Sequence, residues 1–112
     1  MSEFLFLFRG SNRLARSPEE MQKSMQRWGA WFKGLHEKGI VKDAGNPLDA
    51  SGKVVRGHNK DVHDGPYAEA KDLVNGYVVI ETATIDYAVE LSKGCPIFED
   101  GGSIEVRPIL KL

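Results

Sequence analysis

The residues best suited to chemistry lie in one short stretch, in which His58, Asp61, His63 and Asp64 fall within seven positions. A carboxylate beside an imidazole orients the ring and stabilises its protonated form, as in a general acid–base pair. The same residue types bind metals, but no ligand spacing such as His-Glu-x-x-His is present, so no metal site is predicted. An acid–base pair of Asp64 with His58 or His63 is the chemical hypothesis. A solvated hairpin tip is the structural alternative.

Asp64 is followed by a segment with a stiff backbone. Pro66 fixes its own φ at about −65° and disfavours helical backbone at Gly65. An Asp at a turn usually accepts a hydrogen bond from the amide two residues on, but Pro66 has no amide hydrogen. The Asp64 carboxylate must then accept from the Tyr67 amide, from a donor distant in the sequence or from a ligand. It could therefore belong to a site or act as a structural latch.

Two arginines, far apart in the sequence, are candidate anchors for an anionic ligand. In the last predicted strand, Glu105 and Arg107 lie on the face opposite Ile104 and Val106, because successive strand residues alternate. A buried charge must pair or bind something. A salt bridge, within the chain or across a dimer, is the favoured expectation, and Arg107 bound to a ligand carboxylate is the functional one. Arg9 ends the first strand before a helix N-terminus, where anions bind, although a solvated loop is favoured there.

Aromatic and sulfur-containing side chains offer further candidates. Trp28, Trp31 and Phe32 could line a pocket for an aromatic ligand, although the helical spacing of Trp28 and Phe32 favours a role in the core. Trp31 lies on the flank of the same stripe. Cys95 follows a helix C-terminus, where the helix dipole disfavours a thiolate. A small buried side chain is therefore the favoured role for Cys95.

The secondary-structure elements that position these residues are predicted from the spacing of apolar residues and from capping and turn residues. Ser17, Pro18 and Glu20 form a capping box and Gly39 ends the helix. Apolar runs and turn residues predict, in order, a strand over 4–8, a helix over 18–38, a strand from 41, a hairpin with strands at 53–56 and 62, a strand over 77–81, a helix over 86–93 and a strand over 104–109. This order predicts a ferredoxin-like α+β sandwich with an inserted β-hairpin, and the chemical segment follows the hairpin.

The first strand, Phe4 to Phe8, is apolar on both faces, and Tyr77 to Ile80 repeats the pattern. A strand covered by helices on one side only should alternate apolar and polar residues. In so small a protein the expected cover for the second face is another copy of the same sheet. The sequence thus predicts a homodimer formed through the sheet.

Composition limits the classes of protein that fit. The chain has 112 residues, 28% charged and 41% apolar, with a net charge of −1. These values predict a single globular domain over residues 1–112 and argue against general nucleic-acid binding. No apolar run is long enough to span a membrane, and no signal peptide is recognised, so we expect a cytoplasmic protein. The single Cys95 cannot form an intrachain disulfide.

Several motifs together resemble one family. Asp64-Gly65-Pro66-Tyr67-Ala68-Glu69 is similar to the signature of YCII-related proteins of the DGPF-domain branch, with Tyr67 in place of Phe. The resemblance extends to Ser17-Pro18-Glu19-Glu20, Gly76-Tyr77, Gly94-Cys95-Pro96 and the closing residues 103–108. It implies a dimeric α+β barrel. It also implies a His–Asp pair, with Asp64 as the Asp and a His early in the first helix. Positions 18 to 35 contain no His, and His36 lies at the far end.

These observations lead to three functional hypotheses. In the first, the dimer binds a small anionic or aromatic metabolite in a pocket near Asp64 and catalyses an isomerase- or lyase-type reaction by acid–base chemistry. Asp64, His63 and His58 would then be catalytic, Arg9, Arg107, Tyr67 and Glu105 would bind ligand, and no cofactor is expected. In the second, the same pocket binds without catalysis. In the third, which the resemblance implies, the protein is an interaction partner, such as one associated with a sigma factor.

Overall fold

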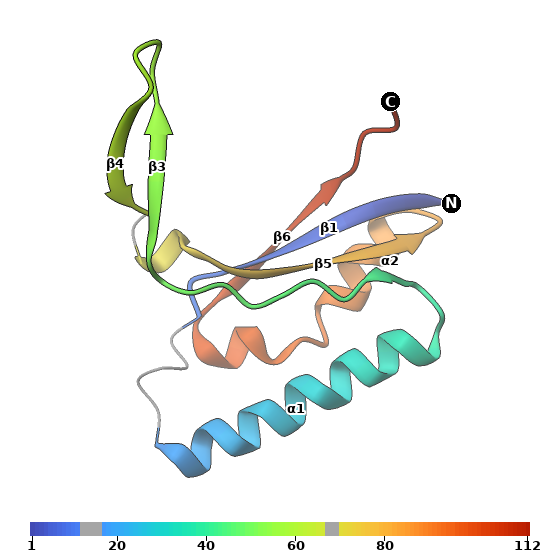
Figure 1. Ribbon diagram of the computed structural model, residues 1–112. Helices are drawn as coiled ribbons and strands as arrows, with labels where there is room; N and C mark the ends of the chain where they lie inside the picture. Colours follow the sequence, from blue (N-terminus) through green and yellow to red (C-terminus); the bar gives the residue numbers. More distant parts are fainter. Residues whose placement is uncertain (12–16, 67–69) are drawn as a thin grey trace.

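A four-stranded antiparallel sheet and a separate two-stranded hairpin form the β structure (Figure 1). The computed structural model describes residues 1–11, 17–66 and 70–112. The elements follow in the order β1 (Ser2–Arg9), α1 (Pro18–Glu37), β2 (Val41–Asp43), β3 (Gly52–Arg56), β4 (Asp61–Gly65), the 3₁₀ turn η2 (Ala70–Asp72), β5 (Val74–Thr82), α2 (Ile85–Ser92), the 3₁₀ turn η3 (Pro96–Asp100) and β6 (Ser103–Pro108).

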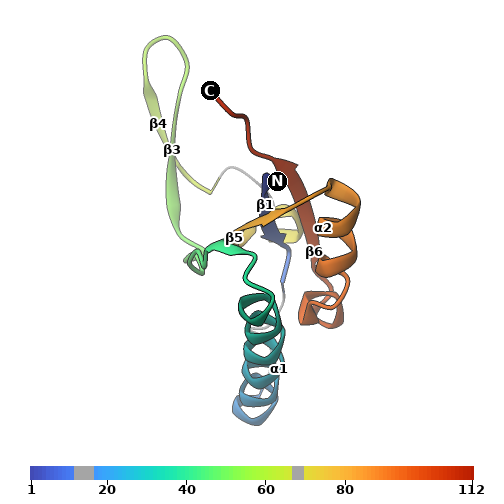
Figure 2. The same cartoon turned by 90° about the vertical axis from the view of Figure 1, so that its right-hand side faces the viewer.

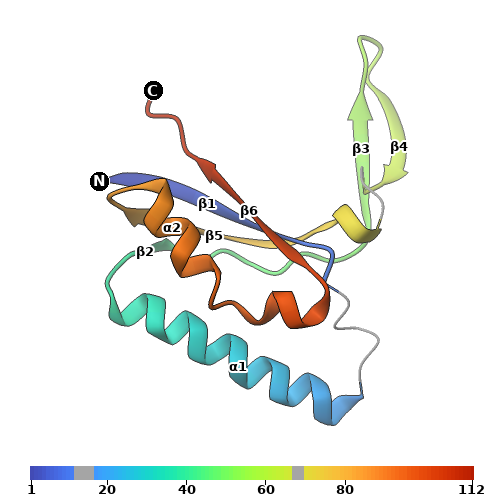
Figure 3. The same cartoon turned by 180° about the vertical axis from the view of Figure 1, so that it is seen from behind.

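The main sheet has the strand order β2-β5-β1-β6. Both helices lie against one face of it (Figures 1 and 3). With the hairpin set aside, this is the split β-α-β arrangement of a ferredoxin-like fold. The predicted α+β sandwich with an inserted hairpin is confirmed. No helix in the described parts of the chain is both long and apolar enough to cross a membrane.

Helix α1 begins and ends as its sequence predicts. The Glu20 amide donates to the Ser17 hydroxyl at 3.2 Å, and that hydroxyl also contacts the Glu20 carboxylate at 3.2 Å. These contacts satisfy groups that the first helical turn leaves without intrahelical partners. At the other end, Gly39 adopts a φ of 70° and turns the chain into β2. Between these ends, Trp28, Trp31 and Phe32 of the helix pack against the core beneath the sheet.

The core fills the space between the sheet and the helices. Phe4, Phe6 and Phe8 of β1 and Val78 and Ile80 of β5 are all buried on this side. The residues between them on the same strands point to the opposite face and are half-buried. These are Leu5, Leu7, Tyr77 and Val79, which pair across the strands as Leu5 with Val79 and Leu7 with Tyr77. No helix or strand of residues 1–11, 17–66 and 70–112 covers this second face, which we call the open face (Figure 2).

Strands β3 and β4 form an arm that rises from the main body, on the side away from the helices (Figures 1 and 2). Residues 52–65, which we call the hairpin arm, pair only with each other in regular β structure. The sequence analysis placed His63 and Asp64 after the hairpin, and this was wrong. Both lie within β4, opposite Val54 and Lys53, because the second strand extends to Gly65 and not only to Val62.

Removing the central core side chain should destabilise the fold strongly. Phe6 has an exposed fraction of 0% and its ring stacks on Trp31 at 6.3 Å. We expect Phe6→Ala to lower the free energy of unfolding by about 3–5 kcal/mol, measured by urea denaturation. Val62→Ala, on the exposed hairpin arm, is the control and should change it by less than about 0.5 kcal/mol. Equal losses in the two variants would contradict this account of the core.

Candidate functional site

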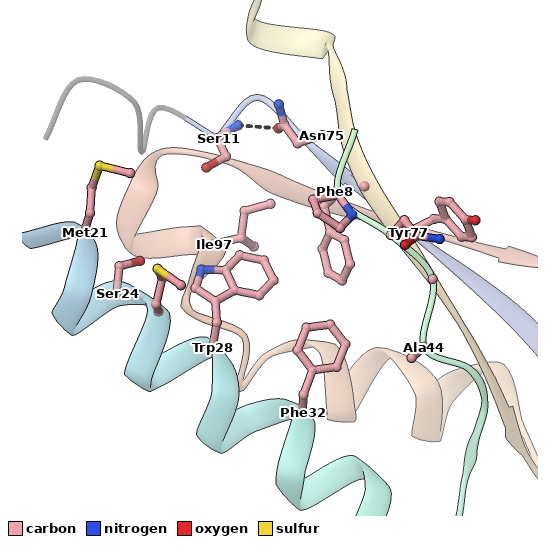
Figure 4. Close-up of a pocket in the computed structure, with 15 residues that line it drawn as sticks. Phe8, Ser11, Met21, Ser24, Trp28, Phe32, Ala44, Asn75, Tyr77 and Ile97 are labelled. Carbon is pink, nitrogen blue, oxygen red and sulfur yellow. Dashed lines mark hydrogen bonds between the residues drawn. The ribbon is translucent and has the colours of Figure 1, made fainter. Parts of the chain in front are cut away.

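A pocket of about 520 Å³ opens between α1 and the sheet. Its walls come from five separate segments: α1 from Met21 to Phe32, the end of β1, the loop after β2, the start of β5 and Ile97 of η3 (Figure 4). The residues that line it are Phe8, Ser11, Met21, Ser24, Met25, Trp28, Phe32, Ala44, Gly45, Asn46, Pro47, Asn75, Gly76, Tyr77 and Ile97. Pockets that bind small molecules commonly have volumes of about 300–1,000 Å³, so this one is of suitable size.

Three aromatic rings form the apolar wall of the pocket. Trp28 meets Phe8 edge-to-face with ring centroids 5.2 Å apart, and it stacks on Phe32 at 6.2 Å. Trp28 and Phe32 thus pack against the core, as expected, and also present ring surface to the pocket. Trp31 faces elsewhere, since its indole N–H donates to the Leu91 carbonyl at 3.1 Å. Of the aromatic residues proposed from sequence, two therefore line the pocket.

The loop of residues 44–47 forms the opposite wall and is held close to β5. Gly45 has a φ of 67°, and a Cβ there would overlap the Tyr77 carbonyl oxygen, so this close approach requires glycine. The Leu48 amide donates to the Asn75 carbonyl at 2.7 Å. On the β1 side, the Ser11 amide donates to the Asn75 side-chain oxygen at 2.8 Å (Figure 4). Two backbone contacts and the side chain of Asn75 thus hold the pocket wall in place.

Three buried polar groups among the lining residues lack a partner. Among residues 1–11, 17–66 and 70–112, no hydrogen bond reaches the hydroxyls of Ser11 and Ser24 or the indole N–H of Trp28, all of which are buried. Ser24 has an exposed fraction of only 3%. Buried polar atoms are nearly always paired in folded proteins, so three unpaired atoms among the residues lining one pocket mark it as a candidate site. The sequence analysis missed Ser24, although a serine between Met21 and Trp28 on the apolar stripe was a usable signal.

The predicted acid–base residues lie on the hairpin arm and do not line this pocket. The side chain of Asp64 is 90% exposed and binds the Lys53 ammonium at 2.6 Å. His63 immediately precedes Asp64 within β4, so its side chain points to the opposite face of the arm. His58 lies in the turn that precedes Asp61. Three strand residues at about 3.3 Å each separate Asp61 from Asp64, so His58 is about 10 Å or more from Asp64 along the arm. A single chain does not bring the three together.

The residues predicted to bind anions form an ion cluster on the open face. The Arg9 guanidinium contacts the Glu105 carboxylate at 2.9 Å and also donates to the Asp72 carbonyl at 2.7 Å. Arg107 contacts the same carboxylate at 3.3 Å. The favoured expectation of a salt bridge between Glu105 and Arg107 is met, with Arg9 as the closer partner. Tyr67, the remaining predicted ligand residue, lies outside the described residues.

This pairing lowers the pKa of Glu105, chiefly through the hydrogen bond from Arg9; desolvation opposes the shift, and the positive charge of Arg9 and the contact with Arg107 add to it. The carboxylate is therefore ionised at neutral pH. Because the folded-state pKa is depressed, the pairing stabilises the fold above the usual pKa of glutamate, and this contribution is lost as the pH falls through the lowered value. Both arginines are thus engaged by groups of the chain itself.

The fold and the pocket together define a small ferredoxin-like protein with a ligand-sized pocket between its sheet and its long helix. The chain belongs to the YCII-related domain family, whose model matches residues 8–112. A search of curated proteins found no significant match. Among solved structures, it is similar to 5-chloro-2-hydroxyhydroquinone dehydrochlorinase from Burkholderia phenoliruptrix AC1100, in complex with 2,5-dihydroxybenzoquinone, with a TM-score of 0.49 and 17% identity over 97% of this chain and 93% of that one. The finer assignment to the DGPF branch stays a prediction.

No cluster of three or more His, Cys, Asp or Glu side chains able to hold a metal ion occurs in the parts of the chain that the structure describes. Cys95 is buried, in line with its predicted packing role. Burial raises the pKa of its thiol to about 12, which outweighs the opposing hydrogen bond from the Ile97 backbone. The thiolate needed for nucleophilic attack is scarce at neutral pH.

Cys95 should therefore react with a thiol reagent only after the protein unfolds. We expect labelling by a disulfide reagent such as Ellman's at pH 8 to be at least a hundredfold slower in the native protein than in guanidinium chloride, because the thiol is both buried and protonated. Free glutathione under both conditions controls for the effect of denaturant on the reagent. Native labelling at the glutathione rate would contradict the buried position of Cys95.

Proposed function

We propose that this protein binds a small, mainly apolar molecule with an aromatic ring in the pocket between α1 and the sheet. The observation that carries the proposal is the aromatic wall of Phe8, Trp28 and Phe32 around a volume of about 520 Å³. Flat rings gain from edge-to-face and stacked contacts in addition to burial of apolar area. Binding sites for small molecules combine such surfaces with a few convergent polar groups, as this pocket does.

Binding is better supported than catalysis at this pocket. None of the described lining residues is a His, Asp, Glu, Lys or Cys, so the lining supplies no ordinary general acid or base near neutral pH. Membership of the YCII-related family is compatible with a small-molecule role. Acid–base catalysis by Asp64 with His58 or His63 stays a prediction, as does association with a sigma factor.

Filling the pocket should abolish ligand binding without unfolding the protein. Met25 lines the pocket yet is 70% exposed, so Met25→Trp adds volume at the mouth without disturbing the core. A library of uncharged one- and two-ring aromatic compounds would be screened by thermal shift. A ligand at 100 times its dissociation constant stabilises the native state by about 2.7 kcal/mol. We expect hits with the wild type and none with Met25→Trp.

Two matched variants make this experiment decisive. Gln26→Trp adds the same side chain at the next exposed position, which does not line the pocket, and should retain binding. Asp64→Asn should also retain it. Loss of binding in Asp64→Asn but not in Met25→Trp would move the site to the hairpin arm. A complete absence of hits with the wild type would overturn the proposed function.

We also propose that a second copy of the chain covers the open face. Leu5, Leu7, Tyr77 and Val79 give this face an apolar centre, and monomeric proteins seldom expose such patches. Charges of both signs surround this centre. Glu3 and Glu81 outnumber Lys42 at the N-terminal end of β1. Arg9 and Arg107, with Glu105 between them, run from the C-terminal end of β1 to its middle, where Arg107 lies opposite Leu5. A two-fold axis lying across the strands would bring opposite ends together.

A charge placed in the centre of the open face should separate the two copies. We expect the wild type to sediment with twice the mass of one chain, and Leu7→Lys to sediment as a monomer at the same micromolar concentration, because an unpaired charge at an apolar interface is costly. Lys33→Glu, on the exposed side of α1, controls for the change of charge. Circular dichroism checks that each variant is folded. A monomeric wild type would contradict the proposal.

A further inference from the structure

The two tryptophans of the chain differ in how their indole N–H groups are satisfied. The N–H of Trp31 donates to the Leu91 carbonyl at 3.1 Å. The N–H of Trp28 is buried and has no partner in the described parts of the chain, although the Trp28 ring lines the pocket (Figure 4). A buried donor left unpaired costs folding free energy. A bound ligand that supplies the partner would remove this cost.

Ser24 presents a second unpaired group one helical turn before Trp28. Residues four apart on a helix lie on the same side, and Figure 4 shows both side chains on the pocket side of α1. A serine inside a helix usually turns to solvent or bonds a carbonyl of the preceding turn. Ser24 does neither, since its hydroxyl is buried with no partner among the residues that the structure describes and the residue is only 3% exposed.

The chemistry of these two groups defines the ligand atom that would satisfy them. An indole N–H can only donate, whereas a hydroxyl can donate or accept. A single oxygen placed between them can accept from Trp28 and either accept from Ser24 or donate to it. Both a phenol hydroxyl and a ring carbonyl meet this requirement. A ring without a polar substituent leaves both protein groups unpaired.

The lining of the pocket also limits the charge of its ligand. None of the residues that line it in the described parts of the chain carries a formal charge. Arg9 and Arg107, expected from the sequence to hold an anion, are paired with Glu105. A carboxylate moved into this pocket would lose its hydration without gaining a counter-ion, which is strongly unfavourable.

Building on the proposed function, we infer that Trp28 and Ser24 select an uncharged aromatic ligand that carries one hydrogen-bonding oxygen, of the phenol or ring-carbonyl type. The two groups are buried, and Met21 and Met25 of the same helix also line the pocket. Methionine side chains adapt readily to a neighbouring molecule, so a ligand can reach both groups with little change in the backbone.

Three probes of nearly the same shape test this inference: naphthalene, 1-naphthol and 1-naphthoate. We expect 1-naphthol to bind at least tenfold more tightly than naphthalene by titration calorimetry, and 1-naphthoate to show no binding at the same concentrations. In the ¹H–¹⁵N spectrum only two indole signals exist, because the chain has two tryptophans. The signal absent from Trp28→Phe should move with 1-naphthol, and the Trp31 signal should stay in place.

Matched variants separate hydrogen bonding from ring contact. Trp28→Phe keeps an aromatic ring but removes the N–H. It should weaken 1-naphthol at least tenfold while changing naphthalene less than threefold. Ser24→Ala should weaken 1-naphthol in the same direction. Trp31→Phe removes the other indole N–H, which does not line the pocket, and should leave both affinities within threefold of the wild type.

The outcomes distinguish this inference from the function on which it rests. Equal binding of naphthalene and 1-naphthol, unchanged in Trp28→Phe, would overturn the inference and leave the aromatic pocket intact. Tighter binding of 1-naphthoate would overturn the selection of uncharged ligands. Failure of all three probes, together with an empty aromatic screen, would overturn the proposed function itself.

Discussion

The alternation of side chains along β1 is the constraint on which the rest of the structure depends. Phe4, Phe6 and Phe8 point to one face and fix where α1 and α2 must pack. Leu5 and Leu7 point to the other face and leave it apolar. Because the period of a strand is two, a slip of one residue would exchange these faces. The pairing of β1 with both β5 and β6 prevents such a slip.

The features that the sequence predicts well are those set by near neighbours in the chain. The N-cap at Ser17, the stop at Gly39 and the alternation in β1 are all local, and each is found where expected. Local signals also gave the order of elements, from which the ferredoxin-like topology followed. The end of β4 was misplaced, because residues 63–65 lack the β-branched and apolar side chains typical of strands, yet β4 continues to Gly65.

The pocket could not be predicted in the same way, because five segments that are distant in the sequence form it. Its wall at Gly45 depends on contact with Tyr77, and its edge at Ser11 depends on a bond to Asn75. Such contacts join residues more than thirty positions apart, and no local pattern encodes them. The residues that appeared most reactive, His63 and Asp64, stand out through composition alone. Their positions on opposite faces of β4 became visible only in three dimensions.

The separation of the hairpin arm from the main sheet has a consequence for cooperativity. A two-stranded ribbon alone is marginally stable in water, and the Val55 and Val62 pair on this one is 62% exposed at both residues. In a single chain the arm is therefore a low-stability unit that opens without the body unfolding. The amide hydrogens of the arm would exchange with solvent through local opening, whereas those of β1 would exchange only through global unfolding. The chain thus has two units of different stability, the hairpin arm and the main body. Only the main body, which contains the pocket, determines the melting temperature.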